Sequence, residues 1–247
     1  MRLKFVSLVL MMMIPTAASA ADVASTLKAL QDLGPKLHDF SADIRNTTES
    51  DGLGNDVTHA GKVYFQRTAD GTTRVHVIFD QRISGNRIQR NEKTEYLLDG
   101  PKLIDRNYRS KTQTTSDILQ PGQKMDLFKI GQGPFPLPIG QDPAAVTKEF
   151  DVKLIAPDKD DPAKSTHLKL TPKPDTRLEK KFNAIDIWVD DASHMPVRVD
   201  TQDKRNGVAS TELSKIALNP PSGLKDSDFK LPDIDNTWNL NIQNYQQ

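Results

Sequence analysis

Residues 61–81 read GKVYFQRTADGTTRVHVIFDQ and carry the clearest structural signal in the chain. Within them, residues 62–67 and 73–81 alternate between apolar and polar side chains on either side of Asp70-Gly71. A period of two places each set of side chains on its own face of a β-strand, and an Asp-Gly pair tolerates the positive φ of a tight turn. This stretch therefore predicts a β-hairpin with one apolar face.

The same alternation predicts strands along most of the chain. Asp99-Gly100-Pro101 marks a second tight turn, and residues 47–61 are polar and read as a linker. The pattern gives about 10–11 strands in two meanders, so the predicted fold is α+β, mainly β, with a strongly curved antiparallel sheet that carries helices on one side. The predicted strands are 40–44, 62–67, 73–81, 95–98, 102–109, 150–156, 166–171, 182–190, 196–202 and 210–218, and residues 238–242 are either a late edge strand or part of a disordered tail.

One amphipathic helix is predicted near the start of the sheet domain. Val23, Leu27 and Leu30 fall on one helical face, and Gly34-Pro35 supplies a stop. This helix would place its apolar face against the sheet.

Residues 116–149 interrupt the strands and predict a helical and Pro-rich insert. Ser116 is a candidate helix cap, and the prolines at 134, 136 and 138 exclude a regular helix or a central strand there. Asp142-Pro143 matches a cap followed by proline at the first helical position. The apolar residues of the insert are Met125, Leu127, Phe128 and Ile130.

Residues 1–20 have the three parts of a secretory signal peptide. Arg2 and Lys4 precede an apolar run, and small residues at 18 and 20 suit cleavage after Ala20. An apolar run of about ten residues spans about 15 Å as a helix, about half of a bilayer core, so a membrane anchor is the poorer interpretation. The sequence therefore predicts export, with a signal at 1–20, a sheet domain at 21–232 and a tail at 233–247.

Charge and composition exclude several classes of function. The 247 residues include 33 Lys and Arg, 33 Asp and Glu, and no Cys. Without Cys there is no disulfide scaffold, thiolate metal site or thiol nucleophile. Removal of residues 1–20 leaves 31 basic and 33 acidic residues, so no positive excess favours nucleic acid as a partner.

A search for catalytic and metal-binding motifs finds almost none. The five histidines are spread one per segment and are expected in solvent or turns, and neither a G-x-S-x-G elbow nor a phosphate-binding loop is present. Acidic sets such as Asp158, Asp160 and Asp161 lie in expected turns, where carboxylates commonly form turns. The sequence therefore predicts no enzyme, no metal and no cofactor, although an exported hydrolase that uses loop carboxylates stays open.

An exported sheet protein with an apolar insert and no catalytic motif suits a binding role. Exposure of an acyl chain to water costs about 0.8 kcal/mol per CH₂, or about 10 kcal/mol for a chain of roughly sixteen carbons. A concave apolar face under movable helices would offset much of that cost and still allow release. A solid core would give the same apolar pattern, so the residues alone leave a cavity and a filled interior open.

Short motifs in a characteristic order extend over nearly all of the chain after residue 20. They are Phe40-x-Ala42-x-Ile44, Gly61-Lys-Val-Tyr-Phe-Gln-Arg67, Leu98-Asp-Gly100, Pro134-Phe-Pro-Leu-Pro138, Leu168-Lys-Leu-Thr-Pro-Lys173, Ile185-Asp-Ile-Trp-Val-Asp190 with Met195-Pro196 after it, and Phe229-Lys-Leu-Pro232. In this order the chain resembles the periplasmic outer-membrane lipoprotein carriers, the LolA-like family.

That resemblance implies an unclosed β-barrel with a helical lid over an apolar cavity. It also implies a soluble, monomeric periplasmic carrier that takes acylated lipoproteins or related lipid-anchored cargo from an inner-membrane ABC-type exporter towards an outer-membrane acceptor. A non-carrier sensor or structural module on the same scaffold, with a pocket filled by its own side chains, is the alternative.

The resemblance and the strand alternation together name candidate residues. In the family an arginine at the end of the second strand hydrogen-bonds the lid, and Arg67 is the matching residue, although Thr68 stands where the family has proline. A guanidinium offers five donors and suits main-chain carbonyls. The acyl-cavity candidates are Phe40, Ala42, Ile44, Val63, Phe65, Val75, Val77, Phe79, Leu168, Leu170, Ile185 and Ile187, and the lid candidates are Leu27, Leu30, Met125, Leu127, Phe128 and Ile130.

Overall fold

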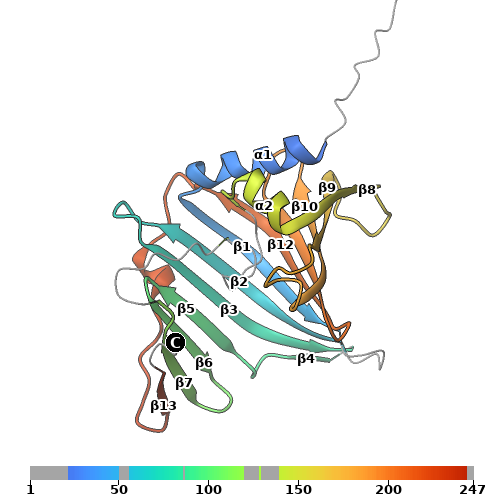
Figure 1. Cartoon of the computed structure of the whole chain (residues 1–247). Coiled ribbons are helices and arrows are strands. Elements are labelled where there is room, and N and C mark those ends of the chain that lie inside the picture. Colours follow the sequence, from blue (N-terminus) through green and yellow to red (C-terminus); the bar gives the residue numbers. More distant parts are fainter. Residues whose placement is uncertain (1–21, 50–55, 86, 120–127, 129–138, 244–247) are drawn as a thin grey trace, which may run out of the picture.

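The computed structural model describes residues 22–49, 56–85, 87–119, 128 and 139–243, which form one curved sheet with two helices across one end (Figure 1). The helices are α1 (Val23–Leu33) and α2 (Pro143–Glu149), and two 3-10 turns are η1 (Gly34–Lys36) and η2 (Asp226–Phe229). The strands are β1 (Asp39–Thr48), β2 (Val57–Arg67), β3 (Thr73–Ser84), β4 (Arg87–Gln89), β5 (Thr94–Asp99), β6 (Lys102–Asn107), β7 (Thr112–Asp117), β8 (Phe150–Ile155), β9 (Ser165–Pro172), β10 (Phe182–Asp190), β11 (Pro196–Asp203), β12 (Val208–Leu218) and β13 (Asn239–Gln243).

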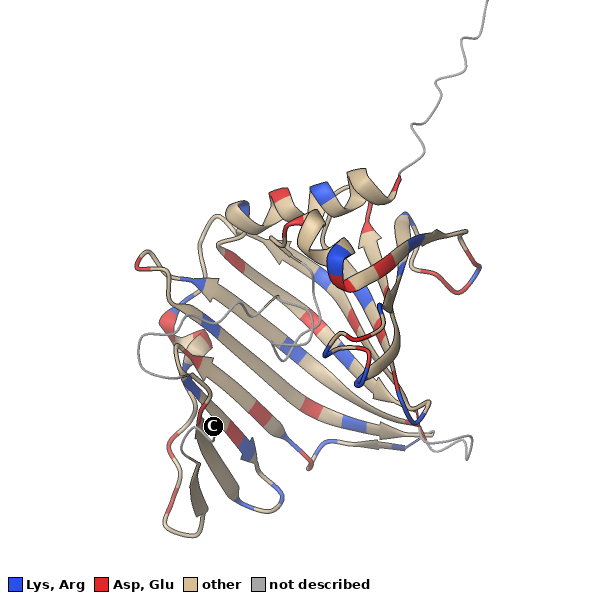
Figure 2. Cartoon of the chain, in the orientation of Figure 1, with Lys and Arg blue, Asp and Glu red and all other residues tan. Residues whose placement is uncertain are grey.

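The sheet is an unclosed barrel, as predicted. Its strand order is β13-β7-β6-β5-β3-β2-β1-β12-β11-β10-β9-β8, with the short β4 paired to β3. Pairing of β1 with β12 joins the two meanders, and β13 pairs with β7 in parallel while the other pairings are antiparallel. Among the described residues, β13 and β8 lie at opposite ends of this order and form the two edges of the sheet. Charged side chains recur along the strands as separate bands between uncharged ones (Figure 2).

The helix α1 begins and ends where its residues predict. Asp22 Oδ1 accepts a hydrogen bond from Ser25 N–H at 2.6 Å, and Ser25 Oγ accepts one from Asp22 N–H at 3.1 Å, which forms a capping box. The helix ends at Gly34, and Leu27 and Leu30 are buried at 3% and 1% exposure. In the parts of the chain described here, no helix is long and apolar enough to cross a membrane.

Several predicted boundaries are wrong. The described residues form thirteen strands, not 10–11, because β4 has three residues and β7, with the sequence TQTTSD, has no apolar residue to show a period of two. Ser116 lies in β7 and is not a helix cap, while Asp142 does cap α2. Residues 47–48 and 57–61 belong to β1 and β2, so the linker between these strands is shorter than predicted.

The C-terminal part of the chain covers the second face of β3. Phe229 in η2 is buried, and its ring lies 4.5 Å from the Arg74 guanidinium. The carbonyl oxygen of Asp228 lies 2.6 Å from Nδ1 of His76, which is 3% exposed. The expectation of solvent or turn histidines is therefore wrong for His76, because a distant segment covers its strand. Local periodicity carries no information about such a contact.

A three-residue ion cluster ties β1 to both of its neighbours. Asp43 Oδ1 lies 2.9 Å from Lys62 Nζ on β2, and Oδ2 lies 2.8 Å from Lys215 Nζ on β12. The hydrogen bonds from Lys215 and then Lys62 lower the pKa of the Asp43 carboxyl from 3.8 to about 2. This stabilisation is present above the unfolded pKa and is lost as the pH falls from about 4 to about 2.

We expect Asp43→Asn to lower the free energy of unfolding at pH 7 by less than about 1 kcal/mol, because exposed ion pairs are screened. The difference from wild type should shrink between pH 4 and pH 2, as measured by urea denaturation. Asp56→Asn, an exposed carboxylate just before β2, serves as the control. A difference that is constant with pH would contradict the ion cluster.

Candidate functional site

The predicted cavity residues of β1, β2 and β3 lie on one face of the sheet. Phe40 pairs with Phe65, and Phe65 pairs with Val75, while Val63 pairs with Val77 in the next row. Directly paired residues point to the same side of a sheet. Phe79 is partly buried, and the buried members of the set are Phe40, Ala42, Ile44, Val63, Phe65, Val75 and Val77.

A small apolar cavity lies at the centre of this concave face and is almost filled. Only about 20 Å³ of free space remains in it. The ring of Phe128, which comes from the predicted lid insert, is 5% exposed and lies 4.9 Å from the ring of Phe65. Phe65 in turn stacks on Phe40 at 5.3 Å. The lining residues are Phe40, Ile44, Val63, Phe65, Val75, Phe128, Pro196, Val197, Arg198, Val199, Thr211 and Leu213.

An open groove of about 360 Å³ continues from this cavity, with which it shares Ile44, Val75 and Thr211. Its volume falls in the range of small-molecule sites, roughly 300–1,000 Å³. The lining is mainly apolar, and its polar members include Asn46, whose amide donates to Thr211 Oγ1 at 2.9 Å. The lining residues are Ile44, Asn46, Val75, Val77, Phe79, Tyr96, Leu98, Leu103 and Thr211.

The remaining predicted cavity residues line neither of these spaces. Leu168 and Leu170 on β9 pair with Ile187 and Ile185 on β10, and all four have 0% exposure. They and Ala42 belong to the same buried cluster as the lid residues Leu27 and Leu30. These four side chains are thus packed solidly beneath the helices. A separate open pocket of about 720 Å³ lies beside α1 at the ends of β8, β9 and β10, and its lining includes Ser25, Leu154 and His167.

Of the four lid candidates in the insert, the structure describes one. Phe128 lies in the central cavity, whereas Met125, Leu127 and Ile130 lie outside the described residues. Gln141 donates through its side-chain amide to the Phe128 carbonyl oxygen. The backbone of Phe128 is therefore tied to the segment that leads into α2.

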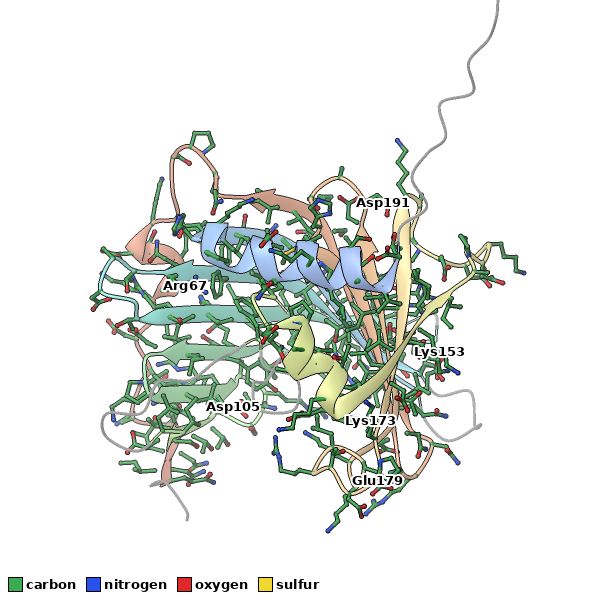
Figure 3. The ribbon with its side chains drawn as sticks, turned by 45° about the horizontal axis from the view of Figure 1, so that its top comes forward. Arg67, Asp105, Lys153, Lys173, Glu179 and Asp191 are labelled. Carbon is green, nitrogen blue, oxygen red and sulfur yellow. The ribbon has the colours of Figure 1, made fainter. Side chains whose placement is uncertain are left out.

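Arg67 contacts the end of α1. As the last residue of β2, it donates from a guanidinium nitrogen to the Gly34 carbonyl oxygen at 3.0 Å (Figure 3). Carbonyls at a helix C-terminus lack intrahelical partners and carry the negative end of the helix dipole, so a cation is favoured there. This hydrogen bond joins Arg67 to the end of the predicted lid helix, and the role of Arg67 as a latch stays a prediction.

The end of α1 also contacts the base of the insert. Gly140 N–H donates to the Leu30 carbonyl oxygen at 2.9 Å. A Cβ atom on Gly34 would lie 2.3 Å from Gly140 Cα, so the two backbones touch. Arg67, α1 and the insert therefore meet at one junction. Gly34 and Gly140 gave no functional signal in the sequence, because the close approach joins residues 106 positions apart.

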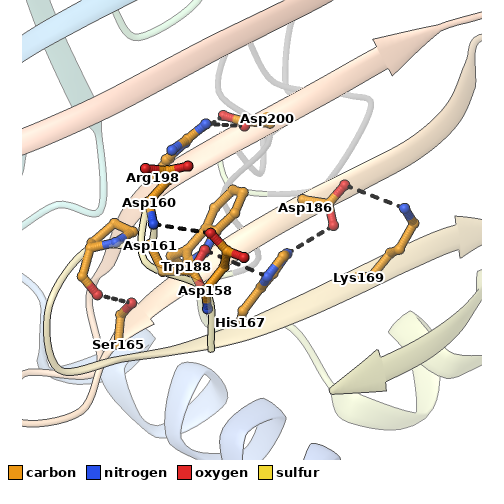
Figure 4. Close-up of polar contacts among 11 residues, drawn as sticks. Asp158, Asp160, Asp161, Ser165, His167, Lys169, Asp186, Trp188, Arg198 and Asp200 are labelled. Carbon is orange, nitrogen blue, oxygen red and sulfur yellow. Dashed lines mark hydrogen bonds and ion pairs between the residues drawn. The ribbon is translucent and has the colours of Figure 1, made fainter. Parts of the chain in front are cut away.

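The acidic loop that sequence patterns left open for hydrolysis is engaged in structural hydrogen bonds (Figure 4). Asp161 Oδ1 accepts from Trp188 Nε1 at 2.6 Å, and the Trp188 ring stacks on His167 at 4.1 Å. The hydrogen bond with the Asp158 backbone, the largest cause, lowers the pKa of Asp161. A general acid in glycoside hydrolysis needs a raised pKa, so this carboxylate is poorly suited to that role.

Sequence comparison finds no matching protein-family model and no curated protein with significant similarity. Structure comparison does find similar chains. A structure of the Pseudomonas aeruginosa MucA/MucB complex contains a chain 12% identical to this one, with 86% of this chain and 62% of that chain covered and a TM-score of 0.48. This chain thus spans less than two thirds of that chain.

LolA superfamily proteins are among its structural neighbours. One from Nitrosomonas europaea is 13% identical, with 86% of this chain and 99% of that chain covered and a TM-score of 0.36. LprF from Mycobacterium bovis is 16% identical, with 80% and 94% covered and a TM-score of 0.37.

Proposed function

We propose that this protein is a carrier that binds an acyl chain on the concave face of its sheet. One observation carries the proposal: an open apolar groove of about 360 Å³ continues into a cavity whose remaining space is taken by Phe128 from the insert. Removal of Phe128 from the cavity would join the two spaces. The acyl chain would then replace the ring against Phe65 and Val75.

The sequence supports a location and a class of cargo for this carrier. Residues 1–20 support export to the periplasm with cleavage after Ala20, residues 21–232 would form the carrier domain, and residues 233–247 would complete it with β13. The motif resemblance supports acylated lipoproteins or related lipids as cargo, with an inner-membrane exporter and an outer-membrane acceptor as partners. The free-volume geometry itself supports any long alkyl chain.

A sensor or structural module is the second candidate, because about 20 Å³ of central space is too little for a ligand unless Phe128 moves. Titration of the purified mature chain with a fluorescent fatty acyl probe separates the two functions. A carrier should bind the probe at one saturable site and lose it on addition of an acylated peptide. Absence of saturable binding, for wild type and for Phe128→Ala alike, would support the module.

Arg67→Leu tests the junction as a latch. Loss of a charge-assisted hydrogen bond to the end of α1 should speed amide exchange at Gly140 and in the last turn of α1 by about tenfold, while β9 and β10 stay as slow as in wild type. Arg67→Lys keeps a cation and should give a smaller change, and Arg45→Leu on an exposed part of β1 is the matched control. Equal exchange at Gly140 in wild type and Arg67→Leu would remove the latch from the mechanism.

A further inference from the structure

The concave face changes polarity from strand to strand. Cross-strand pairing from β1 to β13, with β4 outside the path, defines three rows of residues that point to this side. The rows are Phe40-Phe65-Val75-Leu98-Leu103-Ser116-Gln243, Ala42-Val63-Val77-Tyr96-Asp105-Thr114-Asn241 and Ile44-Gly61-Phe79-Thr94-Asn107-Thr112-Asn239.

Each row is apolar on β1, β2 and β3 and polar on β7 and β13. Asp105 is the one carboxylate in the three rows, and it lies between Tyr96 and Thr114. Tyr96 lines the open groove, as does Leu103 two residues before Asp105 on β6. The carboxylate therefore stands at the border between the apolar groove and the polar part of the same face. Asp105 lies on the part of the sheet away from α1 (Figure 3).

Asp105 is partly buried without a partner for its charge. Within the described ranges, its side chain makes no hydrogen bond or ion pair. Burial raises the pKa of the Asp105 carboxyl. Burial, followed by the charge of Asp105, raises the pKa of the Tyr96 phenol. A partly desolvated carboxylate gains most from a ligand that brings a positive charge.

We propose, on the basis of the carrier function above, that this face takes an amphiphile whose alkyl chain lies over β2 and β3 and whose primary ammonium group pairs with Asp105. Neighbouring strands are about 4.8 Å apart, so β2 and β6 are separated by about 14 Å, a distance that an extended alkyl chain can bridge. Thr114 and Asn241, which follow Asp105 in its row, would offer hydrogen bonds to the rest of the head group. An anionic head group would meet repulsion at Asp105 and is disfavoured.

Three probes with the same tail test this pairing: dodecylamine, dodecanol and dodecanoate, titrated calorimetrically into the mature chain at pH 7. Wild type should bind dodecylamine about tenfold more tightly than dodecanol, and dodecanoate least tightly. Asp105→Asn keeps the shape of the side chain and should bring the amine within about twofold of the alcohol. Asp117→Asn, on the neighbouring strand β7, should keep the wild-type preference.

The outcomes separate the two proposals. Binding of dodecanol without a preference for the amine, or a preference that persists in Asp105→Asn, would overturn the role of Asp105 and leave the carrier function in place. If none of the three probes binds to wild type or to Phe128→Ala, the carrier function fails, and the ammonium site fails with it.

Discussion

Phe128→Ala is expected to raise the affinity for an acyl probe by about tenfold to a hundredfold. Phe128 occupies the central cavity, so a ligand that enters must first displace the ring. Burial of a Phe side chain is worth about 1.5–3 kcal/mol, and this amount opposes binding in wild type. Alanine removes the competitor and leaves the sheet unchanged. The measurement is the dissociation constant of a fluorescent fatty acyl probe.

The same substitution should lower the free energy of unfolding. Because the affinity for the probe should rise while the stability falls, the pair of measurements makes the test specific. A buried Phe→Ala change commonly costs about 3–5 kcal/mol, and ligand binding should restore part of that loss. Phe150→Ala is the control, because Phe150 is 2% exposed at the start of β8 and lines neither space. It should lose stability without a gain in affinity. Weaker probe binding by Phe128→Ala would mean that the Phe128 ring lines the ligand site and does not compete with the ligand.

Faces of strands could be predicted from the sequence because they depend only on neighbours along the chain. Alternation correctly placed Val75 and Val77 on the side that also holds Phe65, and the turn chemistry of Asp70-Gly71 set the hairpin. The bounds of β7 could not be predicted because threonine and serine show no apolar period, although β-branched threonine favours strands. Strand existence was thus predictable where one face is apolar and the other polar.

Contacts between distant segments could not be predicted in this way. Three contacts join residues far apart in the chain: β1 pairs with β12, Gly34 approaches Gly140, and the Phe128 ring packs against Phe65. Alternation also gives the same pattern for a solid core and for a cavity wall. The structure holds both cases in one sheet, because Leu168 and Ile187 are packed solidly while an apolar groove opens beside Val77.

Under the acyl-carrier proposal, the packed and the open parts of the sheet have different roles. The solid cluster that contains Leu168 and Ile187, both at 0% exposure, fixes the scaffold on which α1 rests. The central cavity and the groove beside it hold space that is partly taken by Phe128. Under the acyl-carrier proposal, binding would require Phe128 to leave the cavity and the junction with α1 to open, and the sheet could stay as it is.

Gly61→Ala is expected to lower the free energy of unfolding far more than a substitution of glycine in a turn. Gly61 lies on β2 where the register with β3 shifts between Ala60 and Gly61. A Cβ atom there would lie 1.8 Å from the Ile78 carbonyl oxygen and 3.0 Å from Phe79 Cα, so the backbones of the two strands would have to separate. Overpacking usually costs about 1–3 kcal/mol, and a clash with backbone places this change at the upper end, near 3 kcal/mol.

A loss of about 3 kcal/mol corresponds to a fall in Tm of about 6–12 °C for a domain of this size. Calorimetry of Gly61→Ala measures it, and Gly71→Asn is the matched control. At Gly71 φ is +84° and an added Cβ would meet nothing within 4 Å, while asparagine tolerates positive φ, so that variant should stay within about 1 kcal/mol of wild type. Bulges bend and twist a sheet, so the close approach at Gly61 also supports the curvature that makes the face concave. Wild-type Tm in Gly61→Ala would show that β2 and β3 can separate without cost, and the curvature would then need another source.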